Sequence, residues 1–185
     1  YIYDESERLT RLINNVLQLA RFTKNDIQAN LAPCTVGELI DMVNSKVLHH
    51  CQASGFDTQI QCEENIKAIS IQVDKDFFMQ IIINLIDNAI KFSQKTDTKR
   101  IDITAINKGN NIEFSIRDYG PGIPKSQLKK IFSLFYRIEN ELTRETVGTG
   151  IGLALVKQLA TAMDAKVDVV NCEQGVRLAI HFNIN

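Results

Sequence analysis

Four polar side chains recur along one side of an otherwise apolar stretch near the middle of the chain. Gln80, Asn84, Asn88 and Lys91 follow one another at intervals of four, four and three residues, as on one face of an α-helix. An asparagine oxygen is a hard ligand suited to Mg²⁺, which keeps several waters and shares phosphate oxygens. Lys91 could neutralise phosphate charge one turn further on. A polar helix face that simply meets solvent is the alternative interpretation.

A second motif, Asp118-Tyr119-Gly120-Pro121-Gly122, closes a segment in which apolar and polar residues alternate. An aspartate at a strand end followed by two glycines places a carboxylate beside closely approaching backbone. Such a carboxylate can accept a hydrogen bond from the exocyclic amine of adenine, and it would repel the carbonyl oxygen that guanine has there. The same residues also form ordinary turns, so this motif alone does not decide between the two interpretations.

A third motif, Gly148-Thr149-Gly150-Ile151-Gly152-Leu153, runs into an apolar helical pattern. Glycines just before a helix offer bare N–H groups and the positive end of the helix dipole to an anion. The motif differs from the dinucleotide fingerprint because its spacing is GxGxG and because residues 143–147 do not read as a convincing strand. It also differs from a P-loop, because no lysine follows.

The segment from Ile131 to Arg137 is apolar and aromatic, and a polar stretch without apolar periodicity follows it up to Val147. One interpretation is a small hydrophobic anchor beneath a long loop. The other is the base of a mobile lid, from which Arg137 would reach toward phosphate.

Helical periodicity and alternating patterns predict the elements that must position these motifs. The expected helices cover residues 4–22, 35–53, 74–92, 125–132 and 151–163, and the expected strands cover 56–62, 69–73, 100–107, 111–118, 166–171 and 176–183. Helices beside mostly hairpin-linked strands predict an α+β fold. We expect a two-layer sandwich of a mixed, mainly antiparallel sheet against helices, preceded by one N-terminal helix.

Composition narrows the functional class. The chain has 185 residues and a formal net charge of -1, which gives no electrostatic reason to expect nucleic acid or a membrane surface as partner. Its apolar runs are shorter than the roughly 18–20 residues that span a bilayer. Its 4 cysteines have no CxxC spacing, which favours reduced thiols over a disulfide framework or a zinc site. These features predict a cytoplasmic domain.

Taken together, the motifs resemble the catalytic domain of sensor histidine kinases, in the Bergerat-fold ATP-binding superfamily. Residues 84–92 resemble the N box, 118–122 the first G box, 132–135 the F box and 148–153 the second G box, in the family's order. The resemblance covers roughly residues 35–185. Residues 7–22 are similar to the closing helix of the family's dimerisation domain. We therefore expect that helix over 1–23, a linker over 24–34 and the catalytic domain over 35–185.

The resemblance implies ATP and Mg²⁺ as cofactors, with Asn88 as the metal ligand and with Arg137 and Lys91 in catalytic roles. It implies a nucleotide site made of Asn84, Asn88, Lys91, Phe92, Asp118, Gly120, Gly122, Ile123, Gly148, Thr149, Gly150, Ile151, Gly152 and Leu153.

The implied activity is transfer of the ATP γ-phosphate to a histidine outside this chain. The implied partners are the histidine-bearing dimerisation domain of the same full-length protein and the receiver domain of a response regulator. The full-length protein would be a homodimer, with or without an anchor in the inner membrane, and this chain alone would dimerise weakly or be a monomer. No nucleic-acid partner is expected.

The sequence also departs from the family pattern. The sequence context of His49, His50 and His181 does not match that of the family's phosphorylated histidine. Asp164-Ala165 stands where members often have Gly-Gly, and Val176 where they often have Ser or Thr near the base.

Other functions remain as alternatives. An ATPase of the same superfamily would place a glutamate one turn before the metal asparagine to activate water, but Asn84 stands there and an amide cannot take a proton. A Ser/Thr/Tyr kinase is disfavoured because HRDxxxxN and VAIK-like segments are lacking. A degenerate docking module is a further alternative, which titration with nucleotide would separate from the enzymes.

Overall fold

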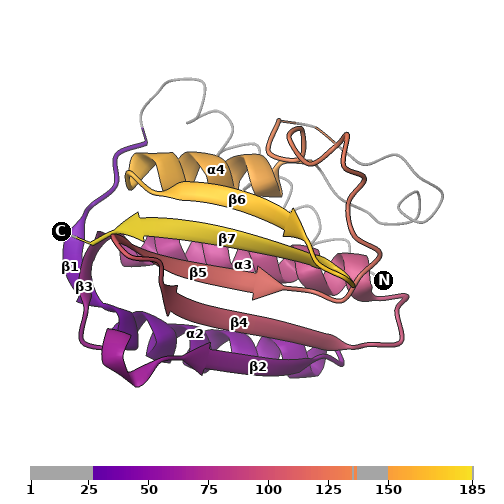
Figure 1. The fold of residues 1–185 in the computed structure, drawn as a ribbon, viewed down its shortest axis with the longest axis horizontal. Helices are drawn as coiled ribbons and strands as arrows, with labels where there is room; N and C mark the ends of the chain where they lie inside the picture. Colours follow the sequence, from indigo (N-terminus) through magenta and orange to yellow (C-terminus); the bar gives the residue numbers. More distant parts are fainter. Residues whose placement is uncertain (1–26, 135, 137–149, 185) are drawn as a thin grey trace, which may run out of the picture.

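A five-stranded sheet carries helices α2, α3 and α4 on one of its faces (Figure 1). The structure, a computed structural model, describes residues 27–134, 136 and 150–184. The predicted two-layer α+β sandwich is confirmed for these residues. Of the helices within them, not one is both long and apolar enough to cross a membrane.

The main sheet has the strand order β2-β4-β5-β7-β6. Strand β2 runs parallel to β4, and the remaining pairs are antiparallel, so the sheet is mixed and mainly antiparallel as predicted. The strands are β2 (Asp57–Cys62), β4 (Arg100–Asn107), β5 (Asn111–Arg117), β6 (Lys166–Asn171) and β7 (Val176–Asn183).

A separate two-stranded sheet joins β1 (Ala32–Thr35) antiparallel to β3 (Ser70–Val73), and a 3-10 turn, Glu64–Ile66, precedes β3. Residues 32–34 were expected to end a linker, but they pair with β3 instead. Their sequence, Ala-Pro-Cys, gives little strand signal, and the pairing depends on a segment almost 40 residues away.

Local hydrogen bonds fix where the first two helices begin. In α2 (Val36–Ala53), Thr35 and Glu38 form the predicted capping box, in which Thr35 Oγ1 accepts from the Glu38 amide and Glu38 accepts from the Thr35 amide. In α3 (Lys75–Ser93), the Asp74 carboxylate accepts from the amides of Asp76 and Phe77 at 3.0 Å each.

Helix α4 (Gly152–Ala162) ends in a Schellman motif. The Asp164 amide donates to Thr161 O at 3.1 Å, and the Ala165 amide donates to Ala160 O at 2.8 Å. Asp164 has a φ of 53°, a left-handed conformation that suits glycine best but that aspartate tolerates. The chain therefore keeps this helix end without the Gly-Gly pair common in the resembling family.

Three phenylalanines lock α3 onto the sheet. The ring centroid of Phe78 on α3 lies 5.0 Å from that of Phe114 on β5 and 6.0 Å from that of Phe182 on β7. Each residue is at most 2% exposed, and the Phe78–Phe114 pair meets edge to face. Aromatic pairs of this geometry add to the stabilisation that burial alone provides. The core therefore fixes the position of α3, which carries the polar stripe.

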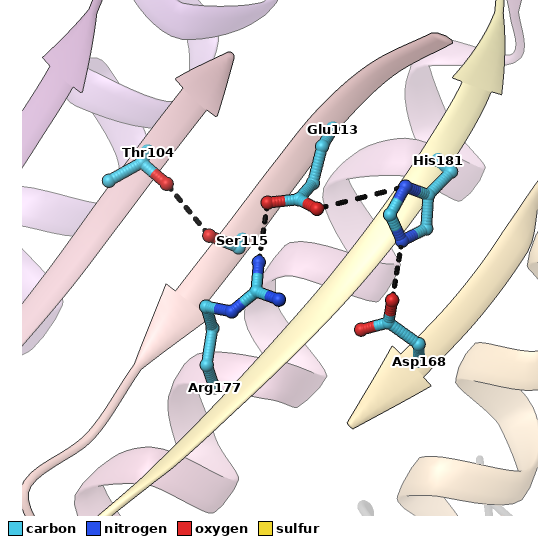
Figure 2. A network of polar contacts seen from close by, with 6 residues as sticks. All are labelled: Thr104, Glu113, Ser115, Asp168, Arg177 and His181. Atoms are coloured by element: carbon cyan, nitrogen blue, oxygen red, sulfur yellow. Dashed lines mark hydrogen bonds and ion pairs between the residues drawn. The ribbon is translucent and has the colours of Figure 1, made fainter. Parts of the chain in front are cut away.

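The opposite face of the sheet carries a polar network (Figure 2). Glu113 on β5 lies directly across from His181 on β7, whose Nδ1 is 3.8 Å from the Glu113 carboxylate and whose Nε2 is 2.8 Å from Asp168 on β6. Arg177 on β7 donates to the other oxygen of Glu113, which is only 2% exposed. The network therefore joins three neighbouring strands through polar contacts.

By distance alone, Glu113, Asp168 and His181 could ligate one metal ion, since a ligand atom from each lies within 4.8 Å of the others. Arg177, however, already neutralises Glu113, and the two ring nitrogens of His181 face different carboxylates. A shared metal would use one ring nitrogen and would lie near a guanidinium charge. We interpret the group as ion pairs that brace the sheet.

The remaining element predictions agree with the structure, with one exception. The helix predicted over 125–132 is replaced by successive turns, in which Gln127 N donates to Pro124 O and Lys130 N donates to Gln127 O. Lys125 and Lys129 would be four residues apart on such a helix and would repel each other, and a helix this short gains little from its own hydrogen bonds. The helix predicted over 4–22 lies outside the described residues.

Candidate functional site

The polar stripe of α3 is partly exposed to solvent. Gln80, Asn84 and Asn88 are half-buried, whereas Leu85 and Ala89, which directly follow the two asparagines, are buried in the core. Asn84 Nδ2 donates to the Gln80 carbonyl at 2.8 Å, which fixes the orientation of its carboxamide. The two asparagines thus present amide groups one helical turn apart.

The start of α4 lies against these asparagines. A Cβ added to Gly152 would be 3.1 Å from Asn84 Oδ1 and 3.8 Å from Asn88 Nδ2. Gly150, just before it, has a φ of 69°, in the left-handed region. The glycine motif therefore brings the amino-terminal end of α4, with its free N–H groups, next to the stripe.

The loop 118–123 meets the other end of α3. A Cβ added to Gly120 would be 3.0 Å from Ser93 Oγ and 3.2 Å from the Phe92 carbonyl oxygen. Phe92 lies one turn beyond Asn88, and the Lys91 ammonium is 5.0 Å from the centroid of its ring. Both glycine motifs therefore contact α3, the second at Asn84 and Asn88 and the first at the carboxyl-terminal end of the helix, at Phe92 and Ser93.

Asp118 follows β5 and is buried, with 7% of its surface exposed. Its Oδ1 accepts from the Gly120 amide at 2.8 Å and from the Val176 amide at 3.2 Å. Burial raises the pKa of this carboxyl above its ordinary value, against the opposing effects of the two amides and of Arg117. A buried carboxylate at a loop that meets α3 is a favourable place for a ligand that donates a hydrogen bond.

Gly175 closes over the Asp118 backbone. Its φ is 81°, and an added Cβ would lie 1.9 Å from Asp118 O and 2.8 Å from Asp118 Oδ1. Only a residue without a side chain fits there. The sequence placed this glycine in the turn before β7, and it was not among the predicted site residues, because its contact with Asp118 spans 57 residues.

Tyr119 anchors the loop to the polar face of the sheet. Its hydroxyl donates to Asp102 at 2.6 Å, which raises the pKa of Tyr119, and the Arg117 guanidinium lies 4.6 Å from the ring centroid. Gln174 Nε2 donates to the Tyr119 carbonyl at 3.1 Å. These contacts hold the loop against β4 and β5 and against the β6–β7 turn. They were not predicted from the sequence.

The structure thus brings together most of the residues predicted for the site. On α3 or in contact with it are Asn84, Asn88, Lys91, Phe92, Gly120 and Gly152, while Asp118, Gly122 and Ile123 belong to the loop that contains Gly120, and Gly150, Ile151 and Leu153 flank Gly152. Arg137, Gly148 and Thr149 lie outside the described residues. The structure adds Ser93, Asn171 and Gly175 to the surroundings of the loop.

Residues 73–185 match the family model described as "Histidine kinase-, DNA gyrase B-, and HSP90-like ATPase". The chain belongs to this family. The match to this ATPase family begins just before α3 and takes in the polar stripe, the Asp118 loop and the glycines before α4. The predicted family resemblance is therefore confirmed.

Within this ATPase family, the chain is similar to sensor kinases. It is 32% identical to "Sensor protein kinase WalK" of Staphylococcus aureus over 180 residues, which are 96% of this chain and 42% of that protein. It matches the crystal structure of full-length ShkA in complex with AMPPNP with a TM-score of 0.80 and 27% identity, over 98% of this chain and 37% of that one.

The catalytic domain of histidine kinase ThkA shows the same fold, with a TM-score of 0.68 and 23% identity over 84% of this chain and 96% of that one. The chain spans less than half of the length of WalK.

Gly175→Ala should destabilise the chain far more than Gly109→Ala. Both glycines have a positive φ, 81° and 77°, so both substitutions carry the same backbone penalty of about 1 kcal/mol. Only the Cβ at 175 meets backbone, whereas nothing lies within 4 Å of that at 109. We expect an extra loss of about 1–3 kcal/mol for Gly175→Ala in urea unfolding. Equal losses would show that the contact with Asp118 does not constrain this position.

Asp118→Asn should stabilise the nucleotide-free chain at neutral pH. Because the pKa of Asp118 is raised above its ordinary value of 3.8, the folded chain holds this proton more tightly than the unfolded chain, and ionisation costs folding free energy. That cost is absent below pH 3.8 and fully present above the raised pKa. The D118N variant keeps an oxygen for both amides. Its advantage in thermal unfolding should therefore vanish on acidification, whereas the exposed Asp97→Asn should show little change at any pH.

An advantage of D118N that is independent of pH, or a lower stability of D118N at neutral pH, would contradict this origin of the raised pKa.

Proposed function

We propose that this chain is the ATP-binding catalytic domain of a sensor histidine kinase, which transfers the ATP γ-phosphate to a histidine outside residues 1–185. Two features support this proposal. Both glycine motifs contact α3, the helix that carries the amide stripe, and the chain is similar to WalK and to ShkA, the latter in complex with AMPPNP.

The observation that carries the proposal is the buried carboxylate of Asp118. The hydrogen bonds that it accepts from described residues go to Oδ1 alone, so Oδ2 is left for a ligand. The exocyclic amine of adenine would donate to that oxygen, whereas the carbonyl oxygen of guanine would be repelled by it. A ligand donor would offset part of the desolvation that makes the ionised carboxyl costly here.

The phosphates and Mg²⁺ would lie toward Asn84, Asn88 and the start of α4. Asn88 is the proposed metal ligand, and the free N–H groups and dipole of α4 would face phosphate oxygens. When bound, ATP would supply the phosphoryl group and Mg²⁺ would offset its negative charge. The protein's part is to position the nucleotide and to offer Lys91, together with Arg137 from outside the described residues.

The acceptor histidine is proposed to lie on the dimerisation domain of the same full-length protein. Within this chain, His50 is 2.7 Å from Asp87 and His181 belongs to the ion-pair network of the sheet, so neither lies among the site residues. A response regulator would then receive the phosphate, as the structure of ThkA in complex with the response regulator protein TrrA suggests. The divisions at residues 23 and 34 and the cytoplasmic location remain part of this proposal.

Transfer is favoured over ATP hydrolysis by the chemistry of Asn84. Its Nδ2 is engaged with the Gln80 carbonyl, and its Oδ1 faces Gly152. A carboxamide cannot accept a proton from water at neutral pH, so a general base is lacking at this position.

The proposal predicts that the chain binds ATP in a manner that depends on both Mg²⁺ and Asn88. Calorimetric titration should show that removal of Mg²⁺ with a chelator weakens ATP binding, and that Asn88→Ala weakens it by about tenfold or more. In the Asn88→Ala variant, the remaining affinity should respond little to the metal. Asn107→Ala, at the exposed end of β4, is the matched control and should bind like the parent.

ATP binding that is unaffected by Asn88→Ala, or a chain that binds no ATP at all, would contradict the proposed site.

A further inference from the structure

Asn171, the last residue of β6, forms two hydrogen bonds with a single residue of the Asp118 loop. Its Oδ1 accepts from the Ile123 amide at 2.9 Å, and its Nδ2 donates to the Ile123 carbonyl at 2.6 Å. A carboxamide bound in this way satisfies both backbone groups of Ile123, as a neighbouring strand would. The contact joins segments that are 48 residues apart.

The same contact fills the space beside a glycine of the loop. Gly122 has a φ of 79°, and a Cβ added to it would lie 3.4 Å from Asn171 Oδ1. Glycines leave the backbone of this loop many accessible conformations, so its geometry depends on external contacts. Asn171 provides such an external contact at Ile123, the last residue of the loop.

The other end of the loop is held by the next strand. The Asp118 amide donates to the Val176 carbonyl at 2.9 Å, and Val176 donates back to the Asp118 carboxylate at 3.2 Å. The hairpin of β6 and β7 therefore holds both ends of the loop, Asp118 from β7 and Ile123 from β6. A change at either end would alter where the buried carboxylate and Ile123 are placed.

We propose that Asn171 is a positioning residue for the base-binding loop, which sets the affinity for the nucleotide through Ile123. This inference rests on the proposed function, because it assigns the loop to the base. It predicts that loss of Asn171 weakens binding of the base. Binding of the phosphates, at the side of the site built from α3 and α4, should stay unchanged.

Two substitutions distinguish this positioning role from a general loss of stability of the domain. Asn171→Asp keeps the shape but replaces the Nδ2 donor by an oxygen that faces the Ile123 carbonyl oxygen, so an attraction becomes a repulsion. Asn171→Ala removes both hydrogen bonds without adding repulsion. Asn107→Asp makes the same chemical change at the exposed end of β4 and serves as control.

The test is titration of the 185-residue chain and its variants with ATP and with inorganic triphosphate, both with Mg²⁺. Loss of both hydrogen bonds in Asn171→Ala should weaken ATP binding by about tenfold, and the repulsion introduced by Asn171→Asp should weaken it further. Binding of triphosphate should stay within about twofold of the parent. Asn107→Asp should change neither affinity.

Equal weakening of ATP and triphosphate, unchanged ATP binding, or failure of both variants to fold would overturn the inference. Titration of Asp118→Asn in parallel distinguishes failure of the inference about Asn171 from failure of the proposed function. If that variant loses ATP affinity and the Asn171 variants do not, only the role of Asn171 is wrong. If Asp118→Asn binds ATP like the parent, the assignment of the loop to the base is wrong.

Discussion

The site depends on one constraint, the burial of an ionisable carboxyl group at the junction of β5, β7 and α3. Asp118 is 7% exposed and is held through Oδ1 by two backbone amides. The closeness of the surrounding backbone explains why Gly120 and Gly175 carry no side chain. Because burial disfavours the charged form, this geometry costs stability in the absence of a ligand, as is typical of groups that are built to bind.

The rest of the fold keeps that loop and the asparagine stripe in fixed positions. The phenylalanine cluster joins α3 to β5 and β7, so the helix that carries Asn84 and Asn88 and the strands that carry the loop form one packed unit. On the other face, the ion pairs of Glu113, Arg177 and His181 join the same strands (Figure 2). The site is therefore assembled on regular elements, whose packing limits movement of its side chains.

Sequence reasoning predicted the layers, most helix and strand boundaries and the motif residues, because hydrophobic periodicity and glycine placement are local signals. It missed contacts that depend on residues distant in sequence. The pairing of Ala32–Thr35 with β3, the closure of Gly175 over Asp118 and the hydrogen bonds of Asn171 to Ile123 each join segments that local patterns cannot relate. Gly175 was visible only as a turn residue, and an asparagine at a strand end is too common to indicate a role.

The central claim, that the carboxylate of Asp118 recognises the base through its exocyclic amine, is tested most directly by a double-mutant cycle with a modified ligand. ATP and purine riboside triphosphate, which lacks that amine, would be titrated into the parent chain and the D118N variant. We predict that the parent prefers ATP by about tenfold and that D118N loses most of this preference. The same preference for ATP in both proteins, or none in the parent, would contradict the claim.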